Sequence, residues 1–193
     1  MLTLASTSRT RMQLLQNAGI MFDAVPPRLD EEAAKTALLA EGATPRDLAD
    51  ALAEMKARKV RKPGLILGCD QVLESIGQLV SKPQDRADAI RILSALSGKR
   101  HELHSAAVLY EDGAPVWRHV QSVKMTMRKT SDAAIAQYVE ENWKDIRYSA
   151  GAYTLEGQGA RLFHRVDGDF FAVLGLPLLP LIDILITRGE LAG

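Results

Sequence analysis

The sequence predicts an α/β protein: a mixed twisted sheet with flanking helices. Residues 65–68 form an apolar run without polar alternation, which is typical of a strand buried on both faces. Residues 101–110 instead alternate in character, as in a strand with two different faces. Between such runs, apolar residues recur at helical spacing, for example at Leu48, Leu52 and Met55. Strands of both kinds separated by amphipathic helices indicate a mixed sheet.

The expected elements follow one another with recognisable stops and caps. Strands are expected at 2–5, 22–25, 65–68, 79–80, 101–110, around 123–127, and at 151–155, 161–166 and 170–174. Helices are expected between them, in 8–18, 30–42, 44–55, 84–96, 131–139 and 178–185. Gly19 ends the first helix, Thr44 with Pro45 begins the third, and residues 111–113 form a hairpin turn. No repeat, low-complexity tract or linker is visible, so we expect a single domain over residues 1–193.

Charge and cysteine content restrict the class of protein. The chain has 24 Lys and Arg against 24 Asp and Glu, whereas proteins that bind nucleic-acid backbones usually carry a basic excess. One cysteine excludes an internal disulfide framework and fits a reducing compartment. No signal peptide is visible, and the most apolar region, 174–186, is too short to span a bilayer. We therefore expect a cytoplasmic protein with neither nucleic acid nor membrane as a partner.

The stretch 65–83 carries the clearest sign of chemistry. Asp70 follows the buried strand, at the position where α/β proteins place ligands. Residues 75–77 are typical of a turn, and Lys82 comes after the returning strand. This order would place Asp70 and Lys82 at the mouth of one hairpin. An acid beside a cation is what metal-assisted phosphate chemistry requires.

A second candidate is the Ser/Thr loop before the first helix. Its hydroxyls and the unpaired N–H groups of the helix start favour an anion. Arg9 and Arg11 lie in the first turns, where a cation is unfavourable for the helix dipole. An ordinary cap by Ser8, with solvated arginines, explains the same residues and is favoured by the local pattern. The two misplaced arginines keep the phosphate interpretation open.

Several familiar chemistries are excluded by spacing. His101 and His104 are three residues apart in an expected strand, so they point to opposite faces and cannot share a metal. No Walker-type loop, dinucleotide fingerprint or G-x-S-x-G elbow occurs. Cys69 has no neighbour that marks it as a nucleophile and fits a buried strand position.

Five short blocks then carry a family resemblance. They lie, in order, at 4–11, 68–72, 81–83, 96–99 and 173–177, with further matches at 149–153 and 167–169. In this order the chain resembles the Maf family, the Maf-like nucleoside triphosphate pyrophosphatases, also described as septum formation proteins. The match runs from the first strand to the last helix, and it implies the inosine-triphosphate-pyrophosphatase-like (Maf) architecture.

The resemblance implies hydrolysis of a nucleoside triphosphate between its α and β phosphates, giving a monophosphate and pyrophosphate. It implies a divalent cation, Mg²⁺ or Mn²⁺, and a homodimer. Asp70 would be the proton acceptor that activates water and, with Glu31, a metal ligand. The phosphate-binding residues would be Ser8, Arg11, Lys56 and Lys82. This fits the residue chemistry, because cations neutralise charge on the leaving group and a carboxylate accepts a proton from water.

Three positions bear on the choice of base and leave it open. Thr10 stands where many members have arginine, and where the subgroup that acts on 7-methyl-GTP is expected to have an aromatic residue. Gln71 and Glu156 match that subgroup, whereas the dTTP/UTP-preferring subgroup has Thr and Gln there. A house-cleaning role on modified nucleotides therefore remains an expectation.

Two other functions compete with this one. A nucleotide-binding regulator of septum formation or cell division, with little turnover, would be expected to have a broken site, whereas Asp70, Lys56 and Lys82 are all present. A house-cleaning enzyme of the inosine triphosphate type would need that family's lysine-bearing N-terminal loop, which residues 6–11 do not supply.

Overall fold

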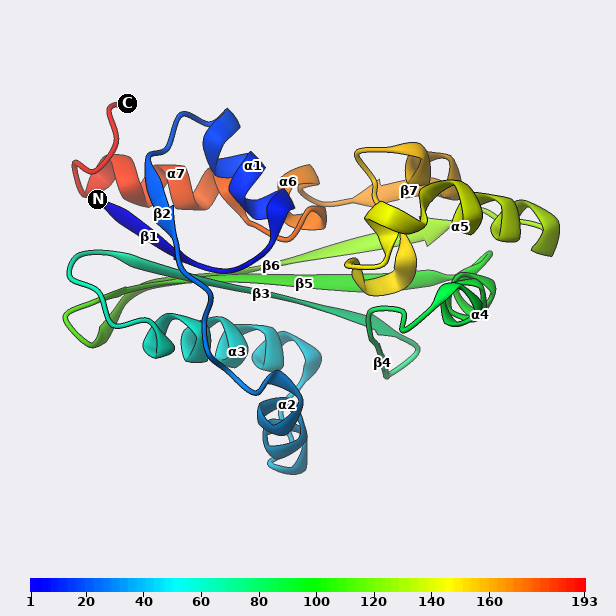
Figure 1. Cartoon of the computed structure of the whole chain (residues 1–193), viewed down its shortest axis with the longest axis horizontal. Helices are drawn as coiled ribbons and strands as arrows, with labels where there is room; N and C mark the ends of the chain where they lie inside the picture. The colour runs from blue at the N-terminus through cyan, green and yellow to red at the C-terminus, as the bar shows by residue number, and fades with distance from the viewer. The chain divides into compact units, whose positions relative to one another are not determined.

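A seven-stranded mixed sheet organises the chain (Figure 1). The computed structural model describes residues 1–193. Its strands are β1 (Leu2–Ala5), β2 (Phe22–Ala24), β3 (Ile66–Ser75), β4 (Gln78–Val80), β5 (Arg100–Glu111), β6 (Ala114–Met127) and β7 (Phe163–Asp167). The strand order is β2-β1-β3-β5-β6-β7, with β4 paired to β3. Pairing is parallel between β1 and both β2 and β3, and antiparallel for β3 with β4 and β6 with β7. The predicted mixed α/β sheet is confirmed.

Six of the seven α-helices begin where a side chain satisfies one of the first backbone N–H groups, whereas the last one follows Pro177 and has no such cap. The α-helices are α1 (Arg9–Asn17), α2 (Glu31–Ala40), α3 (Pro45–Lys59), α4 (Arg86–Leu96), α5 (Asp132–Ile146), α6 (Phe170–Val173) and α7 (Leu178–Thr187), with the 3-10 helices η1 (Ala150–Ala152) and η2 (Gln158–Leu162). The caps that accept a hydrogen bond from the backbone three residues on are Ser8, Asp30, Thr44, Asp85, Ser131 and Asp169. The helix start predicted at Thr44 is therefore confirmed, and Ser131 caps the helix that was expected to begin at residue 131. None of the helices combines the length and apolar character needed to cross a bilayer.

The chain divides into two compact units. The first comprises Met1–Gln71, His104–Gln121 and Asp169–Gly193, and the second comprises Val72–Leu103 and Ser122–Gly168. Strands β3, β5 and β6 contribute residues to both units. The prediction of one domain over residues 1–193 stays a prediction.

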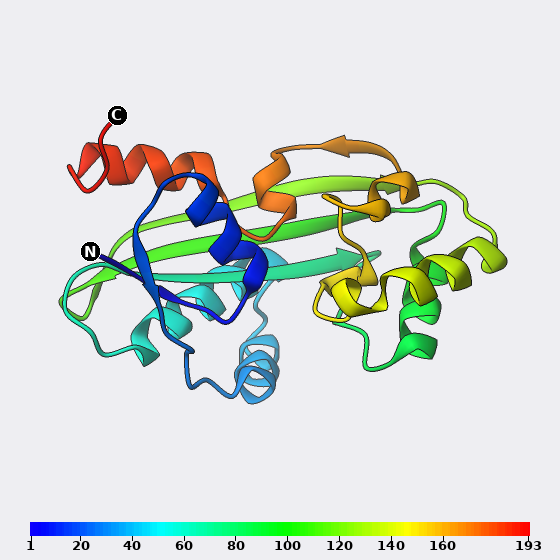
Figure 2. The ribbon, with the colours of Figure 1, turned by 45° about the horizontal axis from the view of Figure 1, so that its top comes forward.

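In the first unit, α1 and α7 cover one face of the sheet and α3 lies on the other face; Figure 2 gives the same arrangement from a second direction. The core under α1 and α7 is aliphatic and fully or nearly fully buried. Its members are Leu2, Leu4, Leu14, Leu15, Ile20, Leu65, Leu67, Cys69, Ala107, Leu109, Leu176, Leu178, Leu181 and Leu185. The β3 residues in this core are odd-numbered, so the even-numbered residues of β3 face α3.

Gly68 allows α3 to lie directly against β3. A Cβ built at Gly68 would be 2.0 Å from the Ala53 carbonyl oxygen and 2.8 Å from the Ala57 nitrogen. No side chain fits between these backbones, so glycine fixes the close approach of α3. The next residue on this face of β3 is Asp70, which therefore meets the same helix.

The second unit packs α4 against α5 and η1. It also encloses an aromatic cluster in which the His101 Nε2 and Tyr153 hydroxyl are 2.8 Å apart and Phe163 lies edge-on to Tyr153. The other nitrogen of His101, Nδ1, is buried without a hydrogen-bond partner. Burial lowers the pKa of His101 to about 4, so this histidine is neutral near pH 7.

Three local predictions were wrong. The strand predicted at 65–68 does not end before Asp70 but continues through it to Ser75, where Leu73, Glu74 and Ser75 pair with β4. Residues 151–155 are not a strand, since Gly151 and Ala152 have positive φ and belong to a 3-10 turn. Residues 170–174 form the short helix α6 rather than a strand, since Asp169 caps it through the Ala172 N–H. A short apolar run does not by itself distinguish strand from helix.

Candidate active site

The candidate site lies where the chain connections reverse direction across the sheet. From β1 the chain passes through α1 to β2 on one side, and it returns through α3 to β3 on the other. The last parallel pair joins Ala5 to Gly68, so the following residues of β3 lie beyond the end of β1. Open α/β sheets bind ligands outside the carboxyl ends of strands at such a switch point.

On the α3 face of β3, one lysine joins two carboxylates. The Lys56 ammonium donates to Asp70 Oδ1 at 2.6 Å and lies 3.1 Å from Glu31 Oε1. Lys56 and Asp70 are only 6% and 5% exposed, whereas the Glu31 side chain is 38% exposed. A buried ion pair without further support is costly, because both charges lose their water. The second carboxylate, that of Glu31, therefore helps to offset the cost of burying the Lys56 charge.

The same two carboxylates bear on the predicted metal. Asp70 and Glu31 converge on a single cationic group, as two carboxylates around one metal ion would. No group of three His, Cys, Asp or Glu residues is arranged to hold a metal. Mg²⁺ typically keeps several waters and takes one or two protein carboxylates together with substrate phosphates. The residues fit a hydrated cation that arrives with a polyphosphate, and not an all-protein metal cage.

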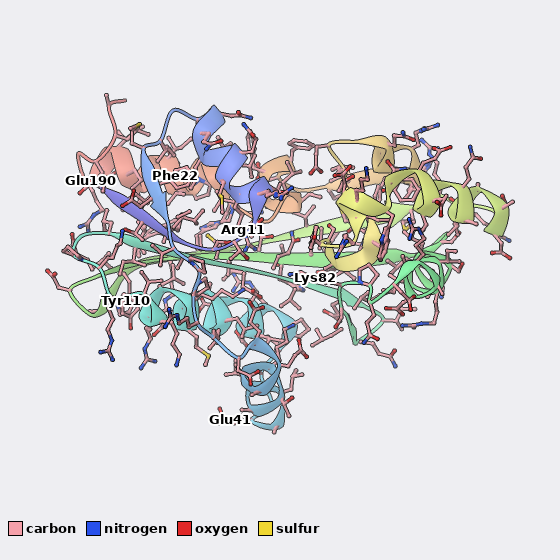
Figure 3. All side chains as sticks on the ribbon, viewed as in Figure 1. Arg11, Phe22, Glu41, Lys82, Tyr110 and Glu190 are labelled. Atoms are coloured by element: carbon pink, nitrogen blue, oxygen red, sulfur yellow. The ribbon has the colours of Figure 1, made fainter.

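Arg11 lies on the opposite side of β3, at the start of α1 (Figure 3). It is 9% exposed, and its guanidinium donates from Nε to the Gly175 carbonyl at 2.8 Å and from Nη1 to the Cys69 carbonyl at 3.1 Å. Both acceptors are neutral backbone groups, and Nη2 has no protein acceptor. A buried guanidinium balanced only by carbonyl dipoles is well suited to an anionic ligand.

Ser8 serves the start of the same helix. Its hydroxyl accepts from the Arg11 backbone N–H at 3.4 Å, and its own N–H donates to the Ser6 hydroxyl at 3.1 Å. The capping interpretation of Ser8 is therefore confirmed, while its contact with a phosphate stays a prediction. The interpretation of both arginines as solvated is wrong for Arg11, because that side chain is buried.

Gln71 points to the Arg11 side of β3, away from the carboxylate that precedes it. Its amide nitrogen donates to the Ser105 hydroxyl at 2.9 Å and to the carbonyls of Ala172 and Val173 at 3.0 and 2.9 Å. The Ser105 hydroxyl itself donates to Ala172 at 2.6 Å. Every neighbour of this nitrogen is thus an acceptor, so the donor side of Gln71 is already used by the protein.

The thiol of Cys69, between these groups, is not a candidate nucleophile. It is fully buried, and burial raises the pKa of its thiol to about 11. A thiol protonated at neutral pH is a poor nucleophile. The expectation of a buried strand position is confirmed.

The remaining predicted residues lie in different places. Thr10 is half-buried in α1 of the first unit. Lys82 and Glu156 both belong to the second unit and are exposed. Lys82 follows β4 and lines a hollow of 570 Å³ between the β3–β4 hairpin and α4, while Glu156 lies in the turn before η2. Their roles toward a substrate stay predictions.

Two groups that contribute to the site were not predicted from the sequence. They are Ser105, which accepts a hydrogen bond from Gln71, and the Gly175 carbonyl, which accepts one from Arg11. Gly175 lies in the matched block 173–177, but its role depends on a contact 164 residues away in sequence. Ser105 lies within β5, and the sequence around it gives no indication of a functional role.

Fold and site together describe an α/β protein in which two carboxylates, a lysine and an arginine lie near a switch point of the sheet. The family model for "Maf-like protein" matches residues 1–188, and the chain belongs to this family. A protein of Roseobacter denitrificans named nucleoside triphosphate pyrophosphatase is 56% identical over 98% of this chain and 97% of its own length. A Caulobacter vibrioides protein of the same name is 49% identical over 98% and 96%. A Mesorhizobium japonicum protein named 7-methyl-GTP pyrophosphatase is 45% identical over 98% and 97%.

Proposed function

We propose that this chain is a nucleoside triphosphate pyrophosphatase, a hydrolase that cleaves the bond between the α and β phosphates. The observation that carries the proposal is the Glu31–Lys56–Asp70 group at the switch point, with Lys56 and Asp70 buried, in a chain whose relatives bear that name. A broken site is what a regulator without turnover would be expected to have, and the acid–lysine pair here is intact.

In the first unit, the proposed roles fall to residues on both sides of β3, with Arg11 on one side and Lys56 and Asp70 on the other. Arg11 would hold phosphate oxygens through Nη2, since its other bonds fix the plane of the guanidinium. Lys56 would neutralise charge that builds on the leaving pyrophosphate. Asp70 would accept the proton of the attacking water at Oδ2, because Oδ1 is bound to Lys56. Ser8 and Lys82 complete the proposed phosphate contacts.

Asp70 and Glu31 would hold a divalent cation, Mg²⁺ or Mn²⁺. When bound, this cation supplies positive charge to the phosphate oxygens and lowers the pKa of bound water. Lys56 shares both carboxylates, so its ammonium balances their charge while the substrate is absent. A homodimer in the cytoplasm, as in the family expectation, belongs to the same proposal and is tested by light scattering of the purified protein and by fractionation of cells.

For the base, we propose a substituted purine such as 7-methyl-GTP in preference to dTTP or UTP. Support comes from the relative named 7-methyl-GTP pyrophosphatase and from the acceptor chemistry of Glu156 and Gln71. A carboxylate suits the N1–H and exocyclic amine of a guanine edge, whereas a pyrimidine edge places carbonyls beside a single N–H. Gln71 acts here as an acceptor through Oε1, since its nitrogen is bound by Ser105 and α6. Thr10 completes the set of proposed specificity positions.

The experiment is a panel of GTP, 7-methyl-GTP, ATP, dTTP and UTP with Mg²⁺ or Mn²⁺, in which monophosphate and pyrophosphate are both quantified. We expect the two products in equal amounts, and EDTA should stop both until excess metal is added. Diphosphate and orthophosphate as first products would place the chain in another reaction class. A wild-type preference for dTTP or UTP would contradict the proposal on the base alone.

A further inference from the structure

Residues 172–175, which comprise the last two residues of α6 and the two turn residues after it and are called the turn 172–175 below, are hydrogen-bonded to both Arg11 and Gln71 in the first unit. Three carbonyls of this turn, at Ala172, Val173 and Gly175, accept bonds from Gln71 and Arg11. Neither α6 nor this turn supplies a charged or nucleophilic side chain of its own. Any influence of the turn on a ligand therefore passes through the residues it holds.

The arginine is held from two directions. Its Nε donates to Gly175 at 2.8 Å and its Nη1 to Cys69, the residue before the proposed proton acceptor, at 3.1 Å. Two bonds from different nitrogens fix both the position and the plane of a guanidinium. Because the guanidinium is planar, the bond to the Gly175 carbonyl also helps to set the direction in which the remaining nitrogen, Nη2, points.

The glycine at 175 is required by two separate features. Its φ is +93°, a conformation that L side chains rarely adopt. A Cβ at this position would also lie 3.4 Å from both Nε and Nη2 of Arg11. A methyl group would thus both shift the peptide that receives Nε and lie against the nitrogen left for a ligand.

Gln71 is held by the same turn. Ala172 and Val173 accept from its amide nitrogen, and Ser105 adds a third acceptor. Reversing the amide would place its oxygen against two carbonyl oxygens, so only one orientation satisfies the hydrogen bonds. The carbonyl oxygen of Gln71 is left to accept from a ligand.

We propose that the turn 172–175 is a positioning element of the active site, in which Gly175 aims Arg11 at the phosphates and the two preceding carbonyls fix Gln71 as an acceptor. The inference rests on the proposed function, since it assumes that Arg11 binds phosphate. It adds that phosphate affinity and base preference share one anchor.

The test compares Gly175→Ala with Gly189→Ala. Gly189 also has a positive φ, +73°, and lies in the first unit, but a Cβ there meets nothing within 4 Å. Both variants carry similar backbone strain, so thermal melts should show similar losses. Binding is measured by calorimetry with the α,β-methylene analogues of GTP and UTP, so turnover is not needed.

We expect Gly175→Ala to raise Kd for both analogues by about 10- to 100-fold, the effect of losing a hydrogen bond to a charged group, while Gly189→Ala binds like the wild type. In an Arg11→Met background, Gly175→Ala should add no general loss of affinity, because its target is gone. The ratio of the two Kd values should change in Gly175→Ala, through Gln71, but not in Arg11→Met.

Three results would overturn the inference. They are wild-type affinity in Gly175→Ala, an equal loss in Gly189→Ala, and an undiminished loss in the Arg11→Met background. An unchanged ratio of Kd values would remove the role assigned to Gln71. A wild type that binds neither analogue would show that Arg11 has no phosphate role, whereas analogue binding without hydrolysis of any nucleotide would refute only the proposed function.

Discussion

Replacing Asp70 by Asn tests the centre of the proposed chemistry with little change in shape. The amide keeps the volume of the carboxylate but cannot accept a proton from water or carry the negative charge that faces Lys56. Losing a general base typically costs about 10²- to 10⁴-fold in rate. We expect kcat to fall by at least that factor while nucleotide binding persists.

The structural cost of this change follows from the burial of the pair. Lys56 and Asp70 are 6% and 5% exposed, with 2.6 Å between the charged atoms. Removing one partner of a buried pair costs about 3–5 kcal/mol. Glu31 remains 3.1 Å from the same ammonium, so we expect a value at the lower end, about 3 kcal/mol. For a chain of this size that corresponds to a melting temperature about 6–12 °C lower, which leaves the protein folded at room temperature.

The assay is steady-state pyrophosphate release at room temperature, with a thermal melt of the same sample. The matched control is Asp50→Asn, the same change of chemistry on the helix that carries Lys56. Asp50 pairs with Arg118 at 2.6 Å and belongs to no proposed catalytic group. We expect the control to keep kcat. Wild-type turnover in Asp70→Asn would falsify the assignment, and a loss fully explained by the unfolded fraction would do the same.

Two further outcomes follow from single positions. His101 has a folded-state pKa of about 4, below its ordinary 6.5, so the unfolded chain binds the proton first and stability falls as pH drops from 6.5 toward 4. The free energy of unfolding should fall by about 2 kcal/mol between about pH 7 and pH 5. Urea unfolding at both pH values should show this loss in the wild type but not in His101→Gln. An equal pH dependence in both proteins would contradict the lowered pKa of His101. Gly68→Ala would place a Cβ 2.0 Å from the Ala53 carbonyl, so α3 must move, and we expect a loss of about 3 kcal/mol or more with lower kcat/KM, because α3 carries Lys56. An unchanged melting temperature and unchanged kinetics in the Gly68→Ala variant would show that α3 tolerates the shift.

Much of the fold could be predicted because its signals are local. The caps at Thr44 and Ser131, the helical stripe in α3 and the apolar start of β3 each depend on residues within one or two turns. The failures are equally instructive. The segment 170–174 is five apolar residues, which fit either a strand or a helix, and the choice depends on one hydrogen bond to Asp169.

The site was predictable as a set of residue types but not as a set of partners. An acid after a buried strand and arginines at a helix start gave Asp70 and Arg11 as candidates. That Lys56, and not a residue close in sequence, pairs with Asp70 depends on the approach of α3 at Gly68. That Arg11 is anchored by Gly175 depends on a turn near the end of the chain. Neither contact, Lys56 with Asp70 or Arg11 with Gly175, follows from a periodic pattern in the sequence.

The pair Asp70 and Gln71 shows most clearly what adjacency in sequence conceals. Side chains of consecutive strand residues leave opposite faces of a sheet, and here one face carries α3 while the other carries α1 and α6. The carboxylate is therefore set by Lys56 and Glu31, and the amide by Ser105 and the α6 carbonyls. The two side chains therefore have separate partners. With the roles proposed for Asp70 in hydrolysis and Gln71 in base selection, this separation gives a physical reason to expect that a substitution at position 71 alters base preference more than it alters the hydrolytic centre.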